Sequence, residues 1–369
     1  MIGKRERKMV KTGQEMTNEA LKYLTDKSVS FTYLSQEDYI KAGGLDMDGT
    51  VAAIQKSFEL HASGHTIQPS KPVIRWGGPE TEETRGRIMT MPSYLGGDLD
   101  VAGMKWIPSM PNNPKELGMP RASAIIILTD PNTGFPLSIM DGTIVSAMRT
   151  GAATGVAAKY LANPESSVVG IIGAGVQSRT QLMAIKSVFK EKIETIKVFD
   201  LNTEKTNQFC NEMSEELNTN VVNAASAEEA IRDSDIVITA TMSTFPYVKG
   251  EWLKEGVFHS EISFWDTAAE EVVHYDRVVV DDYEHVEHHG VDVAYRAVEE
   301  GYVKREQVSN LGDIILNKAE GRQNKNERIL FNPIGMSIHD VSEAYRVYRA
   351  AEEKAVGKQL KLWDHPHWL

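Results

Sequence analysis

The sequence has a single cysteine, Cys210, among its 369 residues. One cysteine cannot form an internal disulfide, which favours a reducing compartment such as the cytoplasm. No uninterrupted apolar run approaches the roughly 18 residues of a transmembrane helix, so a membrane span is not expected. Acidic residues outnumber basic ones by 52 to 40, and no basic stripe exists to neutralise phosphate backbones. We therefore expect a cytoplasmic protein with neither a membrane nor a nucleic-acid partner.

The most informative segment runs from residue 168 to 178, Val-Val-Gly-Ile-Ile-Gly-Ala-Gly-Val-Gln-Ser. A β-branched run enters a glycine turn, and helix-forming residues follow at once. This is typical of a dinucleotide site, where Gly173 permits the turn, Gly175 lets backbone N–H groups approach phosphate, and the helix N-terminus faces the anion. Ser178 stands where the fingerprint prefers Gly or Ala. The residues predicted to contact the cofactor here are Gly173, Ala174, Gly175, Val176 and Gln177.

A second apolar run, 196–200, ends in Asp200, which lies 27 residues after Gly173. An acid there can accept both hydroxyls of an adenosine ribose and would repel a 2′-phosphate, so the sequence predicts NAD rather than NADP. Helix-like segments alternate with further apolar runs at 221–222, 235–241, 257–262 and 277–281. The alternation predicts an α/β fold with a parallel sheet, a Rossmann-type NAD-binding domain. The alternative is an α/β domain whose glycine turn binds no nucleotide.

The nucleotide unit begins near residue 161, so the residues before it need a fold of their own. Two apolar runs within 124–140 flank Asp-Pro-Asn-Thr-Gly, a hairpin signal, and a helix rich in Ala and Gly follows at 144–161. A later helix, 341–355, is expected to return to this first part. We therefore predict an N-terminal extension at 1–28, a discontinuous α+β substrate-binding and dimerisation domain at 29–160 and 320–369, and the NAD-binding Rossmann domain at 161–319.

Five motifs occur in order along the chain: Gly103-Met-Lys-Trp, Leu128-Thr-Asp-Pro-Asn-Thr-Gly-Phe-Pro, Ala147-Met-Arg-Thr-Gly-Ala-Ala, Gly173-Ala-Gly-Val-Gln-Ser and Pro333-Ile-Gly-Met-Ser-Ile-His-Asp. With this combination the chain resembles the ornithine cyclodeaminase/mu-crystallin family from Phe31 to about Ala355. The resemblance implies hydride transfer between NAD and a carbon bearing nitrogen, an amino-acid-like substrate, and a homodimer whose first domains build a shared β-structure.

One branch of the family is more similar than the others. It is that of the N-(2-amino-2-carboxyethyl)-L-glutamate dehydrogenases, which release 2,3-diaminopropionate for siderophore and antibiotic pathways. The segments that carry this closer similarity are 68–72, 104–114, 262–266, 278–282 and 332–336.

Such chemistry requires cations for the substrate carboxylates and an acid/base at the reacting nitrogen. Lys105, in an apolar strand where an unpaired charge is costly, and Arg149, among small residues on a helix, fit the cation role. Lys105 is also predicted to be catalytic. Internal salt bridges are the alternative for both. Lys71 stands where many family members have a substrate-binding Arg. The ammonium of a lysine is a point charge and lacks the two parallel donors of a guanidinium, which implies a different substrate choice.

Asp266 is the predicted acid/base, because it follows the fifth Rossmann strand, at the sheet edge where α/β proteins bind ligands. Classical cyclodeaminases have Gly-Ala-Asp followed by Pro-Gly here, whereas this chain has Phe-Trp-Asp-Thr-Ala-Ala, so Glu270 or Glu271 is an alternative. A helix N-cap would also explain an Asp. The remaining cofactor-binding residues are predicted to be Thr150, Thr241 and Gly335, although either hydroxyl could instead be satisfied locally. Asp340 belongs to the motif around Gly335, and a plain helix-start carboxylate explains it nearly as well.

Histidines recur at helical spacing in two places, His61 with His65 and His285 with His288 and His289. Neither group brings the nearby ligands that a tetrahedral site needs, so we predict solvated faces and no metal.

The predicted function is therefore NAD-dependent oxidation of a secondary amine that joins two amino-acid-like halves. The alternatives within enzymes are cyclodeamination of ornithine or lysine, and reduction of a cyclic imine (a ketimine). An alternative of another class is a crystallin-like protein that binds NAD(P)H and a ligand with little turnover. An acid near position 266 and Asp200 at the ribose argue against this last alternative.

Overall fold

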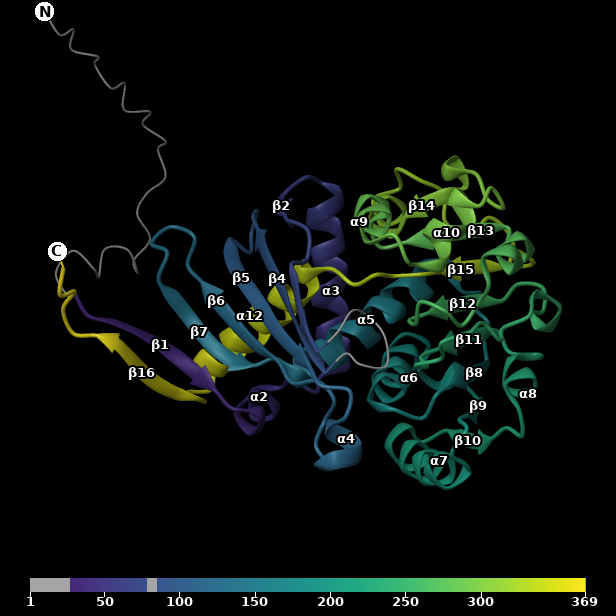
Figure 1. Ribbon diagram of the computed structural model, residues 1–369, viewed down its shortest axis with the longest axis horizontal. Coiled ribbons are helices and arrows are strands. Elements are labelled where there is room, and N and C mark those ends of the chain that lie inside the picture. The colour runs from purple at the N-terminus through teal and green to yellow at the C-terminus, as the bar shows by residue number, and fades with distance from the viewer. Residues whose placement is uncertain (1–26, 78–84, 369) are drawn as a thin grey trace, which may run out of the picture.

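The computed structural model describes residues 27–77 and 85–368. Figure 1 shows two α/β units placed along the long axis of the molecule, each built around one sheet. Of the extension predicted at 1–28, all but the last two residues lie outside the described ranges. Within those ranges, no helix combines the length and the apolar character needed to cross a membrane.

The first unit is built on a mixed sheet with the order β16-β1-β7-β6-β5-β4-β2, and β3 pairs with β4 beside this path. Neighbouring strands are antiparallel except β1 and β7, which are parallel. The hairpin predicted within 124–140 is present as β6 and β7. The strands are β1 (Val29–Leu34), β2 (Thr66–Ile67), β3 (Val73–Trp76), β4 (Gly86–Leu95), β5 (Val101–Ser109), β6 (Ile125–Thr129), β7 (Pro136–Asp141) and β16 (Lys358–Trp363).

One face of this sheet is covered by α12 (Ser337–Glu353), which packs against β4, β5 and β6. The helices α2 (Gln36–Ala42) and α3 (Met47–Ala62) pack on the other side of α12. The short α4 (Asn113–Glu116) lies in the connection between β5 and β6. The late helix therefore returns to the first unit, as the sequence predicts.

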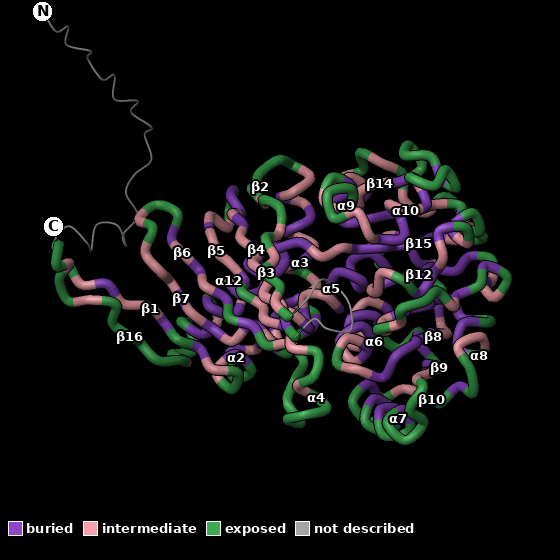
Figure 2. The backbone as a smooth tube through the Cα atoms, viewed as in Figure 1, coloured by how far each residue is buried: buried purple, intermediate pink, exposed green. Residues whose placement is uncertain are grey.

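The second unit is an eight-stranded sheet in the order β10-β9-β8-β11-β12-β15-β13-β14, with every pair parallel. Its central strands are purple in Figure 2, because helices cover both faces. The strands are β8 (Val168–Ile172), β9 (Thr195–Phe199), β10 (Asn220–Asn223), β11 (Ile236–Thr239), β12 (Phe258–Glu261), β13 (Arg277–Val280), β14 (Val308–Asn310) and β15 (Ile329–Phe331). The helices are α6 (Val176–Phe189), α7 (Thr203–Leu217), α8 (Ala227–Ile231), α9 (Tyr283–His289), α10 (Val293–Glu299) and α11 (Leu311–Ile315).

The strand β15 departs from the sequence-based division of the chain. It pairs with β12 and β13 in the parallel sheet, although it falls within the range 320–369 that the sequence assigns to the first domain. The chain therefore crosses between the two units after β15, through residues 332–336, and this crossing brings the Pro-Ile-Gly-Met motif between them.

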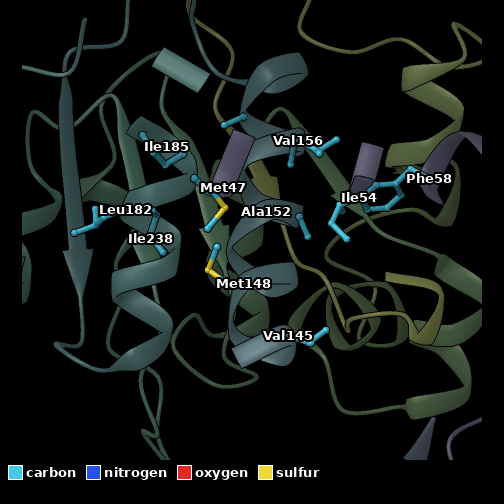
Figure 3. Close-up of a cluster of buried hydrophobic side chains, with 14 of the residues drawn as sticks. Met47, Ile54, Phe58, Val145, Met148, Ala152, Val156, Leu182, Ile185 and Ile238 are labelled. Atoms are coloured by element: carbon cyan, nitrogen blue, oxygen red, sulfur yellow. The ribbon is translucent and has the colours of Figure 1, made fainter. Parts of the chain in front are cut away.

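The two units are joined by α5 (Thr143–Leu161), which packs closely against α6. A Cβ at Gly151 would lie 2.3 Å from the Thr180 carbonyl oxygen, so this approach requires a glycine. The buried side chains in Figure 3 come from both units, with Ile54 and Phe58 of α3 on one side of α5 and Leu182 and Ile185 of α6 on the other. A continuous core of this kind fixes the position of α5, which carries Arg149, relative to the parallel sheet.

Candidate active site

The glycine turn after β8 has the geometry of a phosphate site. Gly173 has φ +103°, and a Cβ there would lie 2.7 Å from the Ala240 carbonyl oxygen, so only glycine fits. Gly175 precedes α6, and a Cβ there would meet no atom within 4 Å. No side chain of the described residues caps the start of α6, so its first N–H groups are available to an anion, as at other helix termini that bind phosphate. Gln177 and Ser178 each have a buried side-chain oxygen with no hydrogen-bond partner among the described residues.

The acid predicted to select the cofactor lies at this turn. Asp200 Oδ2 accepts the Ala174 N–H at 2.9 Å, and Oδ1 accepts the Asn202 N–H at 3.0 Å. Each oxygen keeps a further lone pair that can accept a ribose hydroxyl. The turn and its acid therefore fit an adenosine dinucleotide without a 2′-phosphate.

Asp266 follows β12 and is fully buried. The Thr241 hydroxyl donates to its Oδ1 at 2.5 Å, and the Ser263 hydroxyl donates to its Oδ2. The next helical turn begins only at Ala269, and its N-cap is Ala268, so Asp266 is not a helix cap. Two hydroxyl donors hold the carboxylate at the C-terminal edge of the sheet, beside the strand end that carries Thr241.

The two predicted cations meet at one carboxylate. Lys105 Nζ lies 2.8 Å from Asp340 Oδ1, and Arg149 Nε lies 3.0 Å from the same oxygen. The Lys105 ammonium also donates to the Ser146 hydroxyl at 3.2 Å. The second carboxylate oxygen, Asp340 Oδ2, is buried and has no hydrogen-bond partner among the described residues. The internal salt bridge that the sequence left open is therefore present, and it leaves two cations facing one anion.

Lys71 and Gly335 are brought together at the crossing segment. The Lys71 ammonium donates to the carbonyl oxygens of Ile334, at 3.1 Å, and Gly335. The buried carboxylate of Asp281 accepts the N–H groups of the same two residues, at 3.1 and 2.6 Å. Gly335 has φ +78°, and a Cβ there would lie 2.7 Å from Arg149 Nη1. A side chain at this position would displace the Arg149 guanidinium.

Burial shifts the proton affinities of this cluster. Loss of hydration lowers the pKa of Lys105 to about 7, with a further lowering from Arg149, and the Asp340 charge opposes both effects. Burial likewise lowers the pKa of Lys71 to about 8. At the end of β12, burial raises the pKa of Glu261 to about 8, and the Asp266 charge raises it further. Burial thus disfavours the charged forms of both lysines, and an anionic ligand beside them would stabilise these charged forms.

The Thr150 hydroxyl makes a local contact. It donates to the Ser146 carbonyl oxygen at 2.8 Å, one turn back along α5, which is the local satisfaction that the sequence left open for this residue.

Three acidic residues of the site carry weak signals in the sequence. For Asp340 the sequence suggests only a cofactor neighbour or a helix-start carboxylate, and it gives no prediction for Asp281 or Glu261. Asp281 and Glu261 follow or end apolar strands, and a charge beside an apolar strand is the signal that could have identified them.

The histidines differ from the predicted solvated faces. His61 of α3 and His285 of α9 both bond to Asp282 Oδ2 at 2.8 Å, and His285 also contacts Gln68. One carboxylate draws both rings into a partly buried link between the two units, whereas His65 is exposed. Within residues 27–77 and 85–368, no three side chains of His, Cys, Asp or Glu converge as metal ligands do.

Comparison with known proteins gives a consistent result. The sequence pattern of the ornithine cyclodeaminase/mu-crystallin family matches residues 41–355. An N-((2S)-2-amino-2-carboxyethyl)-L-glutamate dehydrogenase of Staphylococcus aureus is 34% identical over 332 residues, which cover 90% of this chain and 98% of that relative.

Two solved structures are similar over the whole fold. The Δ1-pyrroline-2-carboxylate reductase of Thermococcus litoralis, in complex with NADH and L-proline, aligns with a TM-score of 0.81 at 36% identity, covering 89% of this chain and all of that one. An archaeal alanine dehydrogenase dimer with bound NAD aligns with a TM-score of 0.80 at 34% identity, covering 91% of this chain and all of that one. With its two units, its glycine turn and its matched residues, this chain belongs to the ornithine cyclodeaminase/mu-crystallin family.

Proposed function

We propose that this protein is an NAD-dependent N-(2-amino-2-carboxyethyl)-L-glutamate dehydrogenase. The family membership establishes the enzyme class: the protein is an NAD-dependent oxidoreductase that acts on CH–NH bonds of amino-acid-like compounds. The substrate is the proposal. Hydride leaves the carbon that becomes the keto carbon, the resulting imine takes up water, and 2,3-diaminopropionate and 2-oxoglutarate are released with one proton.

The observation that carries the proposal is that two cations, Lys105 and Arg149, share a single buried carboxylate. Lys105 of β5 and Arg149 of α5 are within ion-pair distance of Asp340. Lys71 lies in the loop before β3, where the charge of Asp281 opposes the lowering of its pKa by burial. The substrate proposed has three carboxylates, whereas alanine and proline have one each. A substrate with several carboxylates suits a site in which Lys105 and Arg149 have only one carboxylate between them.

Each residue of the cluster has a distinct part in the proposed reaction. Arg149 and Lys105 orient the carboxylate next to the reacting carbon. Asp266 accepts the proton of the amine, held in one orientation by Thr241 and Ser263, and afterwards activates the water that attacks the imine. NAD supplies the hydride acceptor, and Gly173 to Gln177 with Asp200 hold its pyrophosphate and ribose. Lys71 fixes the carbonyl groups of the crossing segment in the structure and contributes positive charge to the site.

We also propose a homodimer in the cytoplasm. The face of the first sheet that points away from α12 carries Met104 and Trp106 on β5 and Ile125 and Ile127 on β6. Trp106 and Ile125 are cross-strand neighbours, and both side chains are exposed. An apolar sheet face of this kind favours association, and the archaeal alanine dehydrogenase is a dimer.

Two further activities have specific support among the relatives. Alanine dehydrogenase is supported by an archaeal enzyme that is 36% identical over 325 residues, and imine reduction by the Δ1-pyrroline-2-carboxylate reductase. Ornithine or lysine cyclodeamination and crystallin-like binding have less support from the site. The three enzymatic alternatives act on substrates with a single carboxylate, and the crystallin-like function involves little turnover.

A substrate panel tests the proposal. Purified protein with NAD is offered N-(2-amino-2-carboxyethyl)-L-glutamate, alanine, proline, ornithine and lysine, and NADH absorbance is followed. We expect kcat/KM for the first compound to exceed that for each of the others by about 100-fold or more. Faster turnover of alanine, proline or ornithine would reassign the protein, and binding of NADH without turnover of any compound would favour the crystallin-like function.

A further inference from the structure

Arg121 is a cation outside the cluster of Lys71, Lys105 and Arg149, and hydrogen bonds hold its backbone in position. It lies between α4 and β6, where the Met110 N–H donates to the Arg121 carbonyl oxygen at 2.7 Å. Ser109 and Ala122 form a bridge beside it, and Arg121 Nε donates to the Ser109 hydroxyl at 3.3 Å. The end of β5 thus fixes where this side chain begins.

The guanidinium reaches from the first unit to the second. Arg121 Nη1 contacts the sulfur of Met242, which directly follows Thr241. The Thr241 hydroxyl is the group that donates to Asp266. Arg121 therefore stands across from the strand end that positions the proposed acid/base, at the border between the two units.

The charge of Arg121 has no anionic partner in the described part of the chain. No carboxylate of residues 27–77 or 85–368 lies within ion-pair distance of it, and its cross-unit contact is to a thioether, which is a weak acceptor. Most of the five guanidinium donors are thus not engaged by a strong acceptor. Met242 is 76% exposed, so the contact lies where a small molecule can reach it.

The strand β5 relates Arg121 to the buried cluster. Lys105 and Ser109 are four residues apart on β5 and lie on the same face, since side chains alternate along a strand. At a rise of about 3.3 Å per residue their Cα atoms are roughly 13 Å apart. A substrate that contacts both Lys105 and Arg121 must therefore be elongated and lie along this end of β5.

We infer that Arg121 is a specificity-determining residue that binds a substrate carboxylate remote from the reacting carbon, namely the side-chain carboxylate of the glutamate half. This inference rests on the proposed function. A guanidinium fork matches a carboxylate with two parallel hydrogen bonds, which a neutral amide of the same shape cannot reproduce. Substrates such as alanine, which lack a second carboxylate, do not use this residue.

The test compares two substrates that differ only in that group. N-(2-amino-2-carboxyethyl)-L-glutamate and its glutamine counterpart are assayed with the unaltered protein, Arg121→Gln and Arg121→Lys. We expect the unaltered protein to prefer the glutamate compound by about tenfold or more in kcat/KM, the scale of a charge-assisted hydrogen bond. In Arg121→Gln the KM for the glutamate compound rises by about that factor and the preference disappears. Arg121→Lys retains part of it.

Arg349→Gln is the matched control, because Arg349 is an exposed Arg on α12 that pairs with Glu352 at 3.1 Å. A preference that persists in Arg121→Gln overturns the inference, and so does an equal rate of the unaltered protein with both compounds. NADH affinity is measured in parallel by fluorescence. Weaker NADH binding in Arg121→Gln with an unchanged substrate preference would assign the residue to the cofactor instead. If the unaltered protein oxidises neither compound, the proposed function fails, which is a different outcome from either of these.

Discussion

The Lys105 ammonium and the Asp340 carboxylate lie 2.8 Å apart, and both side chains are almost completely shielded from solvent. They are 235 residues apart in the sequence, one in the middle of a strand and the other in the first turn of α12. Arg149 shares the same carboxylate oxygen. Asp340 is therefore the counter-charge that Lys105 and Arg149 share.

Asp340→Asn removes that charge while keeping nearly the same shape. Lys105 and Arg149 then face each other without an anion, and breaking a buried ion pair typically costs about 3–5 kcal/mol. We expect the free energy of unfolding at pH 7 to fall by about 3 kcal/mol, and by less at pH 9, where Lys105 can lose its proton. Urea unfolding at both pH values measures this. Glu352→Gln, at the exposed end of the same helix, is the control, and equal stabilities of Asp340→Asn and this control would contradict the expectation.

Asp200 is expected to set the choice of cofactor. Its carboxylate lies at the glycine turn, with both oxygens oriented by backbone N–H groups, and a 2′-phosphate placed there would be repelled. We expect NADH to bind at least tenfold more tightly than NADPH, equivalent to about 1.4 kcal/mol. Asp200→Ser is expected to reduce the difference between the NADH and NADPH affinities. Fluorescence titration with both reduced cofactors is the measurement, and equal affinities in the unaltered protein would reject this role of Asp200.

Much of the second unit can be predicted from the sequence because its signals are local. The apolar residues before Gly173 form β8, and the apolar run 257–262 contains β12. Burial on both faces of a parallel sheet requires such runs, and a glycine with φ above zero is required where β8 turns into α6.

The parts that the sequence did not reveal depend on contacts distant in the chain. β15 has three residues, too few for a periodic pattern, and its place between β12 and β13 comes from pairing alone. Asp281 acquires its role only when the crossing segment places the N–H groups of Ile334 and Gly335 against it. No spacing along the chain encodes that contact.

Lys105 is expected to give the proposed substrate site a pH dependence. Its pKa in the unliganded protein is about 7, because burial and Arg149 disfavour the charged form. If Lys105 binds a substrate carboxylate as proposed, only its charged form does so, and binding is expected to weaken as the pH rises through 7, by up to about tenfold per pH unit. We expect the Kd for the substrate to be lowest near pH 6, with Lys71 adding to the loss above pH 8.

Lys105→Arg is the informative variant for this pH dependence, because a guanidinium keeps its charge throughout the range. Its Kd should vary less between pH 6 and 9 than that of the unaltered protein. Calorimetric titration at several pH values provides the comparison, with NADH as the reference ligand. An identical substrate Kd at pH 6 and pH 9 in the unaltered protein would show that Lys105 does not titrate at the site.

The exposed pair Trp106 and Ile125 leads to an expectation about assembly. Placing a charge on this apolar sheet face should prevent a second copy from packing there, so Trp106→Glu is expected to give monomers at micromolar concentration, whereas the unaltered protein is expected to be dimeric. Light scattering measures the mass. Val273→Glu, another exposed apolar position, should leave the dimer intact, and a monomeric unaltered protein would contradict the proposed assembly.

The most direct test of the chemistry is made at Asp266. Asp266→Asn keeps the contacts with the Thr241 and Ser263 hydroxyls in shape but cannot accept a proton. We expect NADH affinity to be unchanged and kcat to fall by about 100-fold or more, the usual scale of general acid–base catalysis. Arg149→Ala should instead act mainly on KM, because the carboxylate contact proposed for Arg149 would be made in the ground and transition states alike.

Thr241→Val distinguishes orientation of the carboxylate from proton transfer itself. It removes the donor to Asp266 Oδ1 and leaves the carboxylate in place, so a smaller loss of kcat than in Asp266→Asn is expected. Stopped-flow measurement of the first turnover separates the hydride step from product release. Full activity in Asp266→Asn would mean that another residue accepts the proton. The first residue to substitute would then be Glu261, which is buried at the end of β12 and whose pKa is raised to about 8. Loss of activity in Glu261→Gln would then identify Glu261, the last residue of β12, as the proton acceptor.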